Sequence, residues 1–253
     1  MKRQTTKPVQ NEQGEMTLLE HLDELRKRLT VTVIALLVGT LVSLAVTTPA
    51  LDLLVSQATK AGIDLQALTP TESTVVFFKV ALVLGAVIAM PVILYEVFQY
   101  LKPGLMPGER RYLIIGIPFA SLSFAAGAAF AAFVALPNAL NFLGGFLADM
   151  FPPNYSAERY IGFVSNVMLW TGLIFETPLV MFILARLGII TPEGFSKARR
   201  FVIIGAAVAA AVITPTPDIL NMMIIMGPFI LLYEVGILLA RLARLGRARA
   251  ERA

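Results

Sequence analysis

The residues with the clearest chemistry lie in one short stretch near the N-terminus, TLLEHLDELRKRL at 17–29. Leucines recur there at 18, 22, 25 and 29, the spacing of one helical face, and Thr17 with Glu20 has the form of a capping box. The opposite face carries acids and bases at the i,i+4 spacing of ion pairs, Asp23 with Lys27 and Glu24 with Arg28. The sequence therefore predicts an amphipathic helix whose charged face either binds a charged partner or is a solvated surface of internal pairs.

Charged side chains also interrupt long apolar runs, at Lys79, Glu96, Glu176 and Glu234. A charge at membrane depth is costly, so each of them is a candidate functional residue. The first two and the last lie near the ends of their runs, where a side chain can instead reach interfacial water. Glu176 lies near the middle of its run and two residues before Pro178, so it must be protonated, paired or in contact with a wet cavity.

Signatures of catalysis are missing from the sequence. The chain has no Cys and a single His, His21, and it contains no H-E-x-x-H, Walker or G-x-S-x-G motif. Asp149, Glu158 and Asp218 do not have the spacing of metal ligands. The sequence predicts a protein that is not an enzyme and needs no cofactor or metal.

The elements that carry these residues are predicted to be membrane-spanning helices. Hydrophobic residues make up 57% of the chain and charged ones 15%, and the mean hydropathy is +0.76. Apolar runs approach or exceed the roughly 20 residues that cross a bilayer. We predict an all-α, polytopic membrane protein in which six transmembrane helices form a cupped bundle, with spans at about 29–48, 74–101, 112–136, 161–187, 201–214 and 219–240.

The segments between these spans are also predicted. Pro49 is expected to end the first span, before an interfacial loop with a short amphipathic helix at 50–73, and Pro137 with Asn138 is expected to end the third. The fourth span is expected to break at 176–178, and a basic loop is expected at 191–200. Residues 1–16 and 246–253 are predicted to be polar tails that flank one membrane domain at 17–245.

Basic residues predict the orientation of the bundle. Of the 21 Lys and Arg residues, 18 fall on four segments that share one face of the six-span topology. By the positive-inside rule both termini are cytoplasmic. The basic character therefore reflects topology, and no nucleic-acid binding is expected.

Several motifs, in order, resemble the TatC family, the polytopic subunit of the twin-arginine protein translocase. They are the acidic and basic helix at 20–29, MPVILYE at 90–96, PGL at 103–105, GERR at 108–111, FETP at 175–178, GIITP at 188–192, TPTPD at 214–218 and YEVG at 233–236. Together they cover about 17–245.

The resemblance implies a core receptor in the cytoplasmic membrane of a prokaryote. It would bind the twin-arginine signal peptides of folded cargo proteins, recruit single-span TatA- and TatB-type partners and associate with itself in a larger complex within the lipid bilayer. Transport in this family uses the proton-motive force and no nucleotide.

The resemblance also assigns residues to the signal-peptide site. The matching acidic positions are Glu24 and Glu109, and Arg26, Arg28 and Tyr100 match further positions of that surface. Carboxylates can accept forked, charge-assisted hydrogen bonds from two adjacent arginines, a geometry that lysine fits poorly. The alternative is that Glu24 pairs with Arg28, and Glu109 with its neighbours at 110 and 111.

Polar positions within the membrane are implied as well. In this family a Glu in the setting of Glu176 faces a polar concavity, and Glu96 and Asp218 are further polar positions at which partners could bind. The sequence departs from the family at Met222, beside Asn221, where a Gln is common near the start of the sixth span. A polar contact with partner helices is in doubt at that position.

Two other function classes remain. A proton-coupled secondary transporter of a small solute would use Glu176 as a relay, and an intramembrane enzyme would need a nucleophile or metal site that we do not find. No internal repeat supports a transporter. The critical acids would lie at the cytoplasmic rim in a translocase and at mid-membrane in a transporter.

Overall fold

The computed structural model describes residues 18–101, 110–214 and 218–250. Its elements are α1 (Leu18–Lys60), β1 (Asp64–Gln66), α2 (Glu72–Leu101), α3 (Arg110–Phe130), the π-helix η3 (Ala131–Ala135), α4 (Leu136–Gly145), β2 (Asn154–Ser156), α5 (Ala157–Phe175), α6 (Thr177–Arg186), α7 (Pro192–Ile213) and α8 (Ile219–Ala250).

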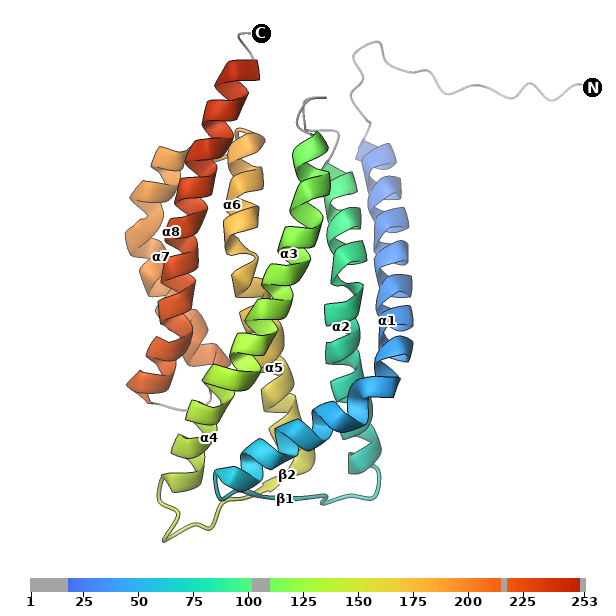
Figure 1. The fold of residues 1–253 in the computed structure, drawn as a ribbon, viewed down its shortest axis with the longest axis vertical. Coiled ribbons are helices and arrows are strands. Elements are labelled where there is room, and N and C mark those ends of the chain that lie inside the picture. Colours follow the sequence, from blue (N-terminus) through green and yellow to red (C-terminus); the bar gives the residue numbers. More distant parts are fainter. Residues whose placement is uncertain (1–17, 102–109, 215–217, 251–253) are drawn as a thin grey trace, which may run out of the picture.

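The helices form a bundle with two outer groups (Figure 1). The first part of α1 runs beside α2, α8 packs against α6 and α7, and α3 with α5 lies between the two groups. The start of α1 and the end of α8 lie at one end of the molecule, which we call the terminal end, and β1 and β2 lie at the other, the strand end.

The all-α membrane architecture predicted from the sequence is confirmed. Within the described ranges, five helical stretches are long and apolar enough to cross a membrane: His21–Lys60, Glu72–Tyr100, Gly116–Gly145, Ala157–Arg186 and Ile219–Arg244. The fifth predicted span, at 201–214, corresponds to α7, whose apolar part at 201–213 is only about 20 Å long at 1.5 Å per residue. The last of the five continues beyond its predicted end at 240, because α8 runs to Ala250.

The sequence predicts that the first span ends at Pro49 and that a short helix follows within 50–73, whereas the structure has one continuous helix through both segments. The helix continues through Pro49 to Lys60, and Figure 1 shows that α1 changes direction partway along. A proline inside a helix removes one backbone hydrogen bond and bends the chain without necessarily ending it. The second part of α1 is held against α5, since the Tyr160 hydroxyl donates to the Leu54 carbonyl at 2.7 Å.

The predicted end at Pro137 and Asn138 is also wrong. The helix passes through the π-turn of η3 and continues as α4 to Gly145, with Pro137 in the first turn of α4. The π-turn and the proline disturb the regular backbone hydrogen bonds. The Asn138 side-chain amide donates to the Val134 carbonyl at 2.7 Å and so satisfies an acceptor on the preceding turn.

The predicted basic loop at 191–200 is instead the first part of α7. Thr191 caps this helix by accepting a hydrogen bond from the Gly194 N–H at 3.1 Å, and Pro192 occupies a first-turn position, where its missing N–H removes no helical bond. The break predicted at 176–178 is confirmed, because α5 ends at Phe175 and α6 begins at Thr177.

Small residues let α1 and α2 approach closely. A Cβ on Gly85 would lie 2.6 Å from the Cα of Thr40, and one on Gly39 would lie 2.5 Å from the Gly85 carbonyl oxygen. The buried Ser43 hydroxyl donates to the Ala81 carbonyl at 2.6 Å across the same contact. Close backbone approach at small residues is a common way for membrane helices to associate.

A feature of the strand end that the sequence did not predict is the pairing of β1 with β2. The strands are parallel and place Leu65 opposite Tyr155. Glu72, at the start of α2, connects the segments of the strand end through its buried carboxylate. This carboxylate accepts four hydrogen bonds, from the Ser156 hydroxyl (2.6 Å) and from the N–H groups of Glu158 (2.7 Å), Leu68 (2.7 Å) and Thr69 (3.3 Å).

We predict that Glu72→Ala lowers the midpoint of thermal unfolding by several degrees, because it leaves a hydroxyl and several N–H groups of the strand end without their acceptor. The measurement is the midpoint of thermal unfolding in detergent. The control is Asp64→Asn, an exposed acid on β1 whose side chain accepts no hydrogen bond within the described part of the chain. Equal midpoints for the two variants would contradict the prediction.

Candidate functional site

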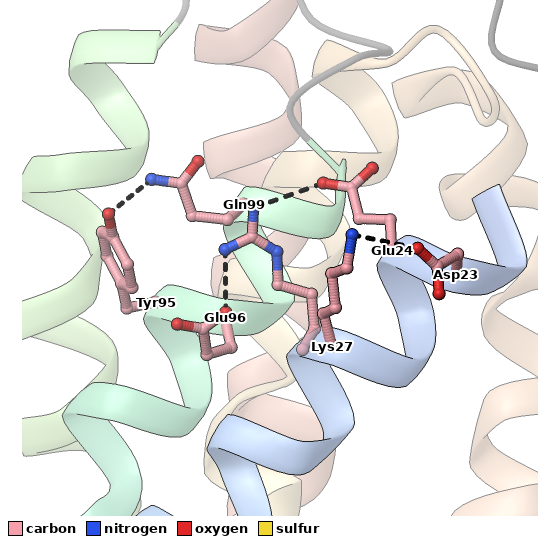
Figure 2. A network of polar contacts seen from close by, with 7 residues as sticks. Asp23, Glu24, Lys27, Tyr95, Glu96 and Gln99 are labelled. Atoms are coloured by element: carbon pink, nitrogen blue, oxygen red, sulfur yellow. Dashed lines mark hydrogen bonds and ion pairs between the residues drawn. The ribbon is translucent and has the colours of Figure 1, made fainter. Parts of the chain in front are cut away.

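The candidate site lies at the terminal end, around Glu24 of α1 and Glu96 of α2 (Figure 2). Arg28 of α1 bridges these two carboxylates. Its guanidinium donates to Glu96 of α2 at 2.9 Å and to Glu24, one turn earlier on α1, at 3.2 Å. The exposed side-chain fractions are 31% for Arg28, 18% for Glu24 and 9% for Glu96. The predicted pair of Glu24 with Arg28 is therefore present, and the pair with Glu96, separated by 68 residues, is new.

Glu24 retains binding capacity in this arrangement. One of its carboxylate oxygens accepts from Arg28, and the other, Oε2, is buried and has no hydrogen-bond partner among the described residues. A buried acceptor without a donor is costly. This oxygen is therefore a ready acceptor for an incoming cation.

Two more pairs of side chains line the same end of α2. The rings of His21 and Tyr100 stack with 4.5 Å between their centroids, which joins α1 to α2 a second time. The Gln99 amide donates to the Tyr95 hydroxyl at 2.6 Å (Figure 2). The predicted site residue Tyr100 thus lies beside the helix that carries Glu24.

The solvent side of α1 holds the remaining predicted residues. Lys27 pairs with Asp23 at 2.9 Å as the spacing predicted, and both side chains are more than half exposed. Arg26 is exposed and makes no ion pair with any described side chain. Glu109 lies outside the described residues.

Glu176 is not part of this cluster. It lies at the break between α5 and α6 and is buried, and neither of its carboxyl oxygens has a hydrogen-bond partner in the described ranges. The Thr171 hydroxyl, one turn earlier, is buried and unbonded in the same way. The structure therefore places a second unsatisfied carboxyl group in the middle of the bundle.

Asp218 lies at the start of α8 and acts as its cap. Its carboxylate accepts from the N–H groups of Leu220 at 3.1 Å and Asn221 at 3.3 Å. Asn221 is buried, and Met222 packs at the edge of the main apolar core. Asp218 therefore caps α8 within the described chain. A role for Asp218 in binding partner proteins stays a prediction.

At the terminal end, ion pairs join α7 to α8. Glu234 pairs with Arg199 at 2.6 Å, and Glu193 pairs with Arg244 at 2.6 Å. The pKa of Glu193 lies below its usual range, chiefly because its own backbone N–H donates to the carboxylate and further because of the positive charge of Arg244. Glu234 is thus paired and partly exposed, in agreement with its position near the end of its apolar run.

Sequence reasoning did not identify Glu96 as the partner of Arg28, nor His21 as the partner of Tyr100. A signal was present: Glu96 and Tyr100 are four residues apart, on one face of α2 near its end. His21 and Arg28 are seven residues apart, on one face of α1. Matching these two faces would have required knowing that α1 and α2 are neighbours.

The fold and the site define a multi-pass helical membrane protein with a polar receptor-like surface at the terminal end. A family model described as "Sec-independent protein translocase protein (TatC)" matches residues 20–228. The chain belongs to the TatC family, as the sequence motifs predicted.

Individual relatives agree over nearly the whole chain. TatC of Aquifex aeolicus is 37% identical over 232 residues, which cover 90% of this chain and 96% of that protein. TatC of Carboxydothermus hydrogenoformans is 35% identical over 226 residues, with 89% and 93% covered. A crystal structure of the twin arginine translocase receptor TatC has a TM-score of 0.75 at 37% identity and covers 88% of this chain and 99% of that one.

We predict that Arg28 and Glu96 are energetically coupled. Arg28→Met alone should cost about 2–3 kcal/mol, since it leaves the nearly buried Glu96 carboxylate unpaired, and the one-third exposure of Arg28 keeps the loss below that of a fully buried pair. Adding Glu96→Gln should recover about 1–2 kcal/mol. The measurement is a double-mutant cycle of reversible unfolding in mixed micelles.

The exposed pair of Asp23 with Lys27 provides the control cycle, for which no measurable coupling is expected. Strict additivity of Arg28→Met and Glu96→Gln would contradict the prediction.

Proposed function

We propose that this protein is the core receptor subunit of a twin-arginine translocase and that Glu24 accepts a guanidinium of the signal peptide. The observation that carries the proposal is the buried, unbonded Oε2 of Glu24 at the terminal end of the bundle. Its membership of the TatC family, together with the likeness to the crystal structure of a twin arginine translocase receptor, supports the receptor role.

The pairing of Arg28 with Glu96 leaves Glu24 available for this role. The Glu96 carboxylate already balances the charge of Arg28 through the shorter contact, 2.9 Å against 3.2 Å to Glu24. A peptide arginine can therefore bind Oε2, or replace Arg28 on Oε1, while Arg28 keeps its bond to Glu96. The exchange leaves no buried charge unpaired, which is the main cost of moving an ion pair.

A second acid is needed for the second arginine, and we propose Glu109 for it. The segment that contains Glu109 connects the end of α2, which carries Glu96 and Tyr100, to α3. Two carboxylates on separate segments could each accept forked hydrogen bonds from one guanidinium. Lysine offers a single compact charge and would bind both acids less well.

The wider role follows from the family. We propose that the protein lies in the cytoplasmic membrane of a prokaryote with both termini cytoplasmic, so that the terminal end receives signal peptides. The basic residues of the segments at that end agree with the positive-inside rule. Partners of the single-span TatA and TatB type, self-association and transport driven by the proton-motive force belong to the same proposal.

The alternative of a proton-coupled solute transporter has no support. A relay through Glu176 needs a second titratable group within hydrogen-bonding reach, and its carboxyl oxygens contact none among the described residues. The relatives that match nearly the whole chain are protein translocase subunits.

We predict that Glu24→Gln weakens binding of an Arg-Arg signal peptide about tenfold to a hundredfold, because one charge-assisted hydrogen bond contributes about this factor to an affinity. The wild-type protein should bind the Lys-Lys variant of the peptide comparably weakly. The measurement is the affinity of the detergent-solubilised protein for a fluorescent peptide.

The matched control is Asp23→Asn, which removes the neighbouring acid with the same i,i+4 pairing but an exposed side chain. Its affinity should stay close to wild type. Equal losses in the two variants would indicate a general effect of charge, and no loss in Glu24→Gln would overturn the proposal for this residue.

The short apolar part of α7 leads to a second prediction. If it leaves the bilayer locally thin, inserting one turn of apolar residues within 201–213 should restore a normal thickness and weaken export. The measurement is export of a reporter protein in cells. The same insertion within residues 1–16 serves as the control, and unchanged export with the longer α7 would contradict the prediction.

A further inference from the structure

A hollow of about 790 Å³ opens at the strand end, between α2, α5 and the end of α7. Its volume lies within the range of sites for small organic ligands. Its lining combines charged and polar side chains with apolar ones. Those that matter here are Glu72, Lys79, Glu158, Arg159, Asn166 and Trp170.

The charges of this hollow are of both signs and only loosely paired. The Lys79 ammonium is 3.7 Å from the Glu158 carboxylate, and these side chains are 34% and 48% exposed. Arg159 forms no ion pair with a side chain in the described chain. Glu72, by contrast, is buried and already accepts four hydrogen bonds, so it has little capacity for a ligand.

One face of α5 contributes a cation, an amide and two aromatic rings to the lining of the hollow. Arg159, Phe163, Asn166 and Trp170 follow the i, i+4, i+7, i+11 spacing of a single helical face and all line the hollow. They span about 16 Å along the helix axis. The order runs from a cation near the strands to a large aromatic ring that is 54% exposed.

We propose that this hollow binds a phospholipid whose headgroup carries a primary ammonium. The phosphate accepts from Lys79 and Arg159, the ammonium donates to Glu158, and an acyl chain lies along Phe163 and Trp170. Val212, 78% exposed, extends this apolar wall on α7.

The mixture of charges selects this headgroup over other common ones. A headgroup with a phosphate and a glycerol would leave Glu158 facing a phosphate without a cation between them. A trimethylated ammonium has no N–H to donate, so it would lose the hydrogen bond to Glu158. The site lies at the end of the bundle opposite Glu24 and does not depend on the proposed receptor function.

The experiment uses Trp170, the only tryptophan in the chain, as an internal reporter. The full-length protein is placed in phosphatidylcholine nanodiscs that contain increasing fractions of a brominated phosphatidylethanolamine, phosphatidylglycerol or phosphatidylcholine. Bromine quenches tryptophan on contact. We expect brominated phosphatidylethanolamine to reach half-maximal quenching at about tenfold lower mole fraction than the other two, the effect of one charge-assisted hydrogen bond.

Glu158→Gln should abolish the preference, because it removes the acceptor for the lipid ammonium, and Asp64→Asn, an exposed acid at the same end that does not line the hollow, should retain it. A second variant, Gly162→Leu, keeps all charges. A Cβ at position 162 would lie 3.5 Å from the Lys79 ammonium, so the leucine side chain fills this part of the hollow. This variant should also abolish the preference. Circular dichroism establishes that each variant is folded.

Equal quenching by the three lipids, or strongest quenching by phosphatidylglycerol, would overturn the proposal. So would a preference for phosphatidylethanolamine that survives both Glu158→Gln and Gly162→Leu.

Discussion

The constraint on which this structure depends is the cost of placing a charge among apolar helices. Three of the four charged residues that interrupt the apolar runs have an ion-pair partner: Glu96 with Arg28, Lys79 with Glu158 and Glu234 with Arg199. Each pair joins two different helices, and the least exposed of them, Arg28 with Glu96, constrains how α1 packs against α2. Glu176 is the exception, because its oxygens have no partner in the described part of the chain.

Much of the architecture could be predicted from local patterns. Apolar runs indicated the membrane helices, the i,i+4 spacing gave the two ion pairs on α1, and the proline at 178 marked the break between α5 and α6. The shortness of the apolar part of α7 was also visible in the sequence. Each of these features depends on residues within a few turns of one another, and spacing rules apply at that range.

The features that were missed join distant segments or involve prolines that a helix accommodates. Arg28 and Glu96 are 68 residues apart, and Glu72 and Ser156 are 84 apart, so no periodicity relates them. The pairing of β1 with β2 brings together the two loops that the sequence treated separately. Pro49 and Pro137 lie within continuous helical stretches, because a proline removes one backbone hydrogen bond without necessarily ending a helix.

The two proposed sites lie at opposite ends of α2, and this helix determines how they can relate. Glu96 and Tyr100 lie near its terminal end, and Glu72 and Lys79 near its strand end, within 30 residues that span about 45 Å. Coupling over that distance requires an element with two discrete arrangements that both ligands bias. The close contact of α2 with α1 at Gly39 and Gly85 leaves little room for sliding, and the four hydrogen bonds to Glu72 fix its start. Lipid at the hollow and peptide at Glu24 should therefore bind independently, with α2 acting as a rigid support for both sites.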